Sequence, residues 1–240
     1  MRRITIIILT FAAAVSLWSC KLSDGTSYGR EYADRMLWER TSHSLSDVGD
    51  VCRHTALAGI LYGIGDEAER RLVADRCCHG ATVEIGANAV SIEYRDSRGE
   101  VERRYCFSTG GSALGTAPWR AHCLASCGSE YDLTLSPVGD GIGIRCDELP
   151  GWYSQTAVDI GMSYLYDADL RCVTVSFFGS GRITERRFDE YTIDYRIERE
   201  ALCNSRGELV EGCIDILYND LIEPYSRHIT VTVSDGAASY

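Results

Sequence analysis

The most reactive side chains of this sequence belong to its cysteines and histidines. Beyond Cys20 there are ten cysteines, at positions 52, 77, 78, 106, 123, 127, 146, 172, 203 and 213, and there are five histidines. Thiol and imidazole groups meet in two clusters, Cys77-Cys78-His79 and His122-Cys123 with Cys127. Neither cluster has the paired C-x2-C spacing of structural zinc sites. We therefore expect no metal, and no other cofactor is indicated.

An even number of cysteines also suggests disulfides. The strand pattern places Cys106 on a polar face with Glu102 and Arg104, and Cys213 on another polar face. An unpaired thiol gains little there, so both residues are disulfide candidates. Cys146 lies on an apolar face, where a free thiol packs as a small hydrophobic group. A fully reduced set of cysteines is the alternative.

Catalytic motifs are scarce. Lys21 is the only lysine, which excludes P-loop, Schiff-base and Ser-Lys chemistry from the folded domain. The glycine-rich segment 137–144 is then better explained as a hairpin turn than as a phosphate loop. No G-x-S-x-G motif supports a Ser-His-Asp arrangement, and acidic pairs such as Asp147 and Glu148 are expected by chance among 35 acidic residues. Catalytic residues remain unknown.

Aromatic residues near turns provide a candidate binding site. Trp152 and Tyr153 follow the Pro150-Gly151 turn, where exposed rings can stack on the apolar face of a ligand such as a sugar. Trp119 follows a glycine-rich loop, where its ring could likewise be exposed to a ligand. The alternative is that these rings fill the edge of a β core.

The first twenty residues have the pattern of an export signal. Two arginines precede an uncharged apolar run of about 14 residues, shorter than the roughly 20 that a membrane-spanning helix needs. Leu17-Trp18-Ser19-Cys20 resembles the lipobox of bacterial lipoproteins, although Trp18 is bulkier than the usual residue. The resemblance implies cleavage after residue 19, lipidation of Cys20 and a lipid anchor in the bacterial cell envelope. Lys21, in place of an aspartate, favours the outer membrane. A plain secretory signal cut elsewhere is the alternative.

The charge of the chain limits its partners. Residues 1–19 carry two arginines and no acidic residue, so removing them changes the formal net charge from −11 to −13. Binding to phosphate backbones requires a basic face, which makes nucleic acid an unexpected partner. We expect a membrane contact through the lipid and an envelope protein or glycan as partner.

Periodicity predicts the fold class. A polar tether over residues 20–29 precedes helices over 30–79, with Ser44 and Asp47 resembling a capping box and Asp66 capping a last helix. From residue 81 to 240 the period changes to 2, which predicts nine or ten antiparallel strands separated by glycine-containing turns, including one at 179–181. The expectation is a single α+β domain over 30–240, with a sandwich or open barrel as its β part. Pro150-Gly151 is a possible internal boundary.

Three functions remain open. The leading one is a membrane-anchored envelope lipoprotein that acts as a non-enzymatic binding or structural module. An envelope hydrolase with scattered catalytic residues would require a deep pocket holding a histidine or carboxylate with a shifted pKa. A carrier of an apolar ligand would require a large hydrophobic cavity.

Overall fold

The computed structural model describes residues 27–151, 154–186, 190–204, 207–222 and 224–240. The chain divides into two compact units, residues 1–39 and 40–240. All of the β-structure belongs to the second unit. No helix in the described part of the chain is both long and apolar enough to cross a bilayer.

Two helices open the described chain, α2 over Ser27–Gly63 and α3 over Glu67–Cys77. The predicted cap at Asp66 is confirmed, because its side chain accepts a hydrogen bond from the Glu69 amide at 2.8 Å. The capping box predicted at Ser44 and Asp47 is wrong, since both lie inside the continuous helix α2. Ser44 is instead buried, and its hydroxyl lies 2.7 Å from that of Thr156. A cap-forming residue is tolerated in a helix interior when tertiary contacts satisfy its side chain.

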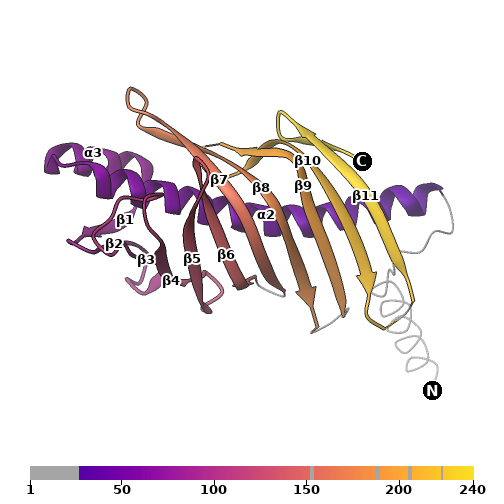
Figure 1. Ribbon diagram of the computed structural model, residues 1–240. Helices are drawn as coiled ribbons and strands as arrows, with labels where there is room; N and C mark the ends of the chain where they lie inside the picture. The colour runs from indigo at the N-terminus through magenta and orange to yellow at the C-terminus, as the bar shows by residue number, and fades with distance from the viewer. Residues whose placement is uncertain (1–26, 152–153, 187–189, 205–206, 223) are drawn as a thin grey trace, which may run out of the picture. The chain divides into compact units, whose positions relative to one another are not determined.

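Twelve strands follow, and all neighbours in the sheet are antiparallel. Their order in the sheet equals their order in the sequence, so the chain forms a meander that Figure 1 shows from magenta to yellow. The strands are β1 Ala81–Ile85, β2 Ala89–Arg95, β3 Val101–Ser108, β4 Trp119–Leu124, β5 Glu130–Val138, β6 Gly141–Pro150, β7 Gln155–Asp167, β8 Cys172–Glu185, β9 Tyr191–Cys203, β10 Leu209–Asp220, β11 Ser226–Ser234 and β12 Ala237–Ser239. The predicted β domain with a helical segment is confirmed. The twelve strands form one open sheet, and this arrangement does not identify the sandwich or barrel that was expected.

Some neighbouring strands are joined by tight turns within the described residues, whereas a longer loop connects β3 to β4. The predicted hairpin at residues 96–99 is confirmed, with Asp96 accepting hydrogen bonds from two backbone amides of its own turn. Pro150 ends β6, and β7 begins at Gln155 and pairs with β6, so the same sheet continues across the suggested boundary. The predicted turn at 179–181 is wrong, because these residues lie inside β8. Gly181 makes room there for the buried Tyr195 ring on the neighbouring strand.

One face of the sheet packs against residues 40–63 of α2. The alternating pattern places aliphatic and aromatic side chains on this inner face, and burying each one contributes about 1.5–3 kcal/mol. The rings of Tyr62 in α2 and Trp119 in β4 meet edge to face at 5.7 Å. Trp119 is fully buried and donates a hydrogen bond to the Ser112 carbonyl. The suggestion that Trp119 is an exposed binding ring is therefore wrong, because the ring fills the core.

Candidate functional site

Three of the predicted site residues lie outside the described residues. Cys20, the predicted lipidation site, belongs to the N-terminal segment, and Trp152 with Tyr153 falls in the gap between 151 and 154. The residues that flank this gap, Gly151 and Ser154, line a cleft that is described below.

The two disulfide candidates are free thiols in the structure. Cys106 in β3 is opposed by Ser91 and His122, and its sulfur lies 3.5 Å from the Ser91 hydroxyl. Cys213 in β10 is opposed by Thr232 and Arg199. Since β3 and β10 are separated by six strands, each about 4.8 Å from the next, the two cannot bridge each other. Pairing with other cysteines stays a prediction.

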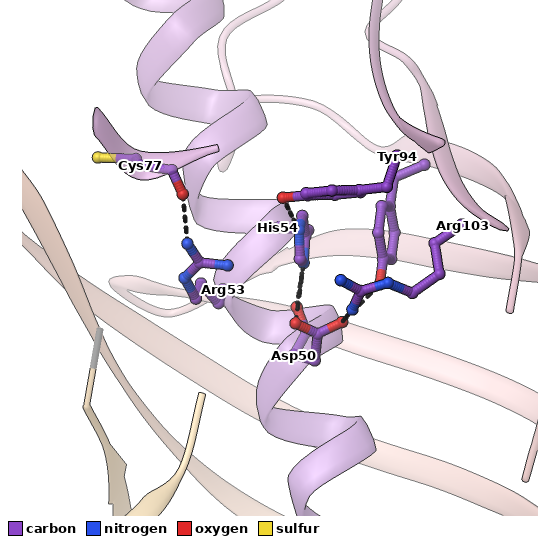
Figure 2. A network of polar contacts seen from close by, with 7 residues as sticks. Asp50, Arg53, His54, Cys77, Tyr94 and Arg103 are labelled. Atoms are coloured by element: carbon purple, nitrogen blue, oxygen red, sulfur yellow. Dashed lines mark hydrogen bonds and ion pairs between the residues drawn. The ribbon is translucent and has the colours of Figure 1, made fainter. Parts of the chain in front are cut away.

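A buried polar network connects α2 to the start of the sheet (Figure 2). His54 is fully buried, with its Nδ1 2.8 Å from the Asp50 carbonyl oxygen and its Nε2 2.9 Å from the Tyr94 hydroxyl. Its ring also stacks on Tyr105, with ring centroids 4.0 Å apart. Both ring nitrogens therefore have partners within the protein, and the ring has no solvent access. This arrangement suits a structural histidine better than a catalytic one.

Asp50 is the charged centre of this network. The Tyr105 hydroxyl donates a 2.5 Å hydrogen bond to Asp50 Oδ2, and Arg103 Nη1 lies 3.3 Å from the same oxygen. Burial alone would raise the pKa of Asp50, but His54, Tyr105 and Arg103 together hold it well below its usual value. Asp50 is therefore an ionised, paired carboxylate that fixes helix to sheet.

A cleft opens along α2, one helical turn from Asp50 and next to Gly151 and Ser154. We call it the helix cleft; its volume is about 350 Å³, and it is lined by Arg40, His43, Ser44, Ser46, Asp47, Gly151, Ser154, Thr156 and Tyr191. Desolvation by its neighbours, followed by the negative charge of Asp50, raises the pKa of Asp47 to about 6. A carboxyl group that titrates near neutral pH can accept and release a proton.

A larger hollow lies on the opposite, exposed face of the sheet. We call it the strand groove; its volume is about 550 Å³, and it crosses β6 to β11. One row of directly opposed residues runs across it, in the order Arg145, Asp159, Ser180, Arg196 and Asp215. Basic and acidic side chains therefore alternate along the groove, separated once by a hydroxyl group.

Some charges of the strand groove are paired and others are not. Arg182 and Asp194 form a two-pronged ion pair, and Asp215 accepts a 2.6 Å hydrogen bond from Thr230. Asp159, by contrast, has no hydrogen bond or ion pair with any described side chain, although it lies between Arg145 and Ser180. An exposed carboxylate of this kind can accept hydrogen bonds from a ligand without losing an internal partner.

No family model, curated protein or solved structure matches this chain. The candidate sites rest on the chemistry of their own residues. Within the described ranges, no group of three or more histidine, cysteine, aspartate or glutamate side chains is arranged to hold a metal ion.

Neither the strand groove nor the helix cleft was predicted from the sequence. Asp194 and Arg196 lie on the outward face of β9, opposite the buried face of Tyr191, Ile193 and Tyr195. Their neighbours Asp159 and Asp215 come from strands distant in sequence, and only the cross-strand register brings them together. The sequence signal that could have revealed the groove was the alternation that places charged residues on the outward face of successive strands.

Proposed function

We propose that the protein is a lipid-anchored lipoprotein of the bacterial envelope whose strand groove binds a polar partner. The anchor is inferred from the signal pattern that ends at Cys20, and the outer membrane is inferred from Lys21. The proposed partner is an envelope protein or glycan, in keeping with the acidic charge of the chain.

The observation that carries the binding proposal is the alternating row of the strand groove. Guanidinium groups only donate hydrogen bonds, and carboxylates only accept them. A row that alternates the two presents donors and acceptors in turn to a ligand with hydroxyl or amide groups. The unpaired carboxylate of Asp159 supplies an acceptor in the middle of the row.

Variants of the groove test this proposal. Full-length protein in detergent is mixed with two probes, protein-free envelope polysaccharide and detergent-extracted envelope protein, and the dissociation constants are measured. We expect Arg145→Ala combined with Asp159→Asn to weaken binding to one probe about tenfold or more, because two hydrogen-bonding groups are lost. Arg120→Ala, at an exposed arginine of β4 outside the groove, is the matched control. Binding that is absent, or equal in all three proteins, would overturn the proposal.

The helix cleft supports a second candidate function, an envelope hydrolase. Asp47 has the shifted pKa expected of a general base, and His43 lies in the same cleft. The polar lining gives no support to a carrier of apolar ligands. Hydrolysis of envelope polysaccharide by the wild type that is lost in Asp47→Asn would favour the hydrolase, and no hydrolysis by either protein would remove it.

A further inference from the structure

An exposed aromatic ring lies next to the strand groove. Phe178 in β8 is 54% exposed, and its partner across the sheet is Gly161 in β7. A Cβ atom built on Gly161 would lie only 2.6 Å from Cζ of the ring and 2.9 Å from Cε1. The ring therefore lies over the bare backbone of Gly161, in space that any other residue would fill.

The same arrangement is repeated one strand further along. Gly161 is directly opposed by Gly143 in β6, and a Cβ atom on Gly143 would lie 2.8 Å from Cγ2 of Val138. Val138 is 51% exposed. Two glycines in neighbouring strands thus allow an aromatic ring and an aliphatic group to lie against the sheet. We call this surface, formed by Phe178, Val138, Gly161 and Gly143, the apolar platform.

The apolar platform borders the alternating row. The register pair Gly161 and Phe178 is two residues along from the pair Asp159 and Ser180, and residues two apart in a strand share a face. The exposed ring therefore has an unpaired carboxylate and a hydroxyl group beside it. Glycine within a strand often marks a place where another group approaches the backbone closely.

We propose that the apolar platform and Asp159 form a subsite for a neutral hexopyranose unit of a glycan, an inference that rests on the proposed function and names its ligand class. A pyranose ring has an apolar face of C–H groups, which stacks on an aromatic ring, and a rim of hydroxyl groups. Phe178 receives that face, and Asp159 accepts hydrogen bonds from the rim. The Ser180 hydroxyl, next to Asp159, can both donate hydrogen bonds to the rim and accept them from it.

The charges of the groove favour a neutral glycan over an acidic one. Three arginines and four aspartates line the groove. Each arginine has an acidic neighbour: Arg182 pairs with Asp194, Arg145 lies 3.7 Å from Asp147, and Arg196 lies 3.2 Å from Glu198. Asp159, on the same face as the ring, carries a negative charge that would repel an acidic sugar. Hydroxyl groups, which both donate and accept, match an alternating set of arginines and aspartates.

The test is an array of neutral glucose, galactose and mannose oligosaccharides with their uronic-acid counterparts, probed with the full-length protein in detergent. We expect binding to at least one neutral oligosaccharide and about tenfold weaker binding by Phe178→Ala. Gly161→Ala should weaken it as well, because the new methyl group lifts the ring from the sheet. Phe178→Tyr keeps the ring and should retain binding. Leu170→Ala, which removes an exposed side chain from the turn between β7 and β8, is the control.

The outcomes separate this proposal from the proposed function. No binding to any neutral oligosaccharide, a preference for the uronic acids, or unchanged binding by Phe178→Ala would overturn the saccharide subsite. After any of these outcomes, the variant that combines Arg145→Ala with Asp159→Asn can still lose envelope binding. The strand groove would then be a binding site without a saccharide subsite. Melting temperatures of all variants are measured alongside, so that loss of binding by an unfolded variant is not counted as support.

Discussion

The hydroxyl of Tyr105 in β3 donates a 2.5 Å hydrogen bond to the carboxylate of Asp50 in α2. This bond connects the sheet to the helix that covers its inner face. It also belongs to the group of contacts that keeps Asp50 ionised. Removing this hydrogen bond is the first test of how α2, which lines the helix cleft, is held against the sheet.

We expect Tyr105→Phe to lower the free energy of unfolding by about 1.5–3 kcal/mol, the usual value for a hydrogen bond to a charged group. The ring stack on His54 is kept, so the change isolates the hydroxyl. Urea unfolding at pH 7 measures the effect. Tyr62→Phe, which removes a more exposed hydrogen bond to Ala87, serves as control and should cost less. Equal losses in both variants would contradict the special role of Asp50.

The same bond should respond to acid. Because the pKa of Asp50 is depressed in the folded protein, its stabilising effect is complete above the unfolded-state pKa of about 3.9 and is lost as the pH falls below it. Since both proteins share the unfolded-state pKa, the difference between wild type and Tyr105→Phe should stay constant from pH 7 to well below 4 and shrink only as the pH falls towards the depressed folded-state pKa of Asp50. A difference in stability that grows as the pH falls would show that the predicted direction of the pH dependence is wrong.

Asp47 should have the opposite pH dependence. Its pKa is raised to about 6 in the folded state, so the folded protein binds the proton more tightly than the unfolded chain. Its contribution to stability therefore falls as the pH rises from about 4 to 6. Asp47→Asn should flatten the stability profile in this window, measured by melting temperature. Asp75→Asn, on α3 and outside the cleft, should keep the wild-type slope.

Gly49 tests the close approach of helix and sheet. A Cβ atom on Gly49 would lie 2.8 Å from the Gly207 carbonyl oxygen and 3.0 Å from the Cys203 sulfur. Alanine favours a helix over glycine by about 1 kcal/mol, yet overpacking against backbone costs about 1–3 kcal/mol. We expect Gly49→Ala to destabilise the protein by about 1 kcal/mol in urea unfolding. Gly63→Ala, where the space is open, should not destabilise it.

Processing at Cys20 tests the proposed anchor. Mass spectrometry of protein made in a bacterial host should show an acylated N-terminus at Cys20, and Cys20→Ser should lose the lipid. The protein should then leave the membrane fraction. A wild-type protein without lipid, or one cut at another position, would rule out the anchor.

Local rules predicted the parts of the fold that depend on neighbours in sequence. Alternation placed Cys146 on an apolar face, and the structure buries it together with Ile142 and Ile144 of the same face. The cap at Asp66 was also predicted. Such signals hold because capping and alternation are set within a few residues.

The sequence-based predictions were wrong where contacts between residues distant in the sequence decide the structure. Ser44 has the chemistry of a helix cap, but its partner Thr156 is 112 residues away. Gly181 looks like a turn residue, because glycines that allow a turn and glycines that allow close packing are the same residue type. The alternating row of the strand groove depends on the register of strands β6 to β10, which the sequence alone does not specify.

Arginine footprinting by mass spectrometry tests the binding groove most directly. Full-length protein is treated with an arginine-specific reagent, with and without the envelope probe that it binds. We predict that the probe protects Arg145 and Arg196 in the groove. Arg120 of β4 and the exposed Arg71 of α3 should stay equally reactive with and without the probe. Protection of Arg40 in the helix cleft instead, or protection of no arginine, would contradict the account.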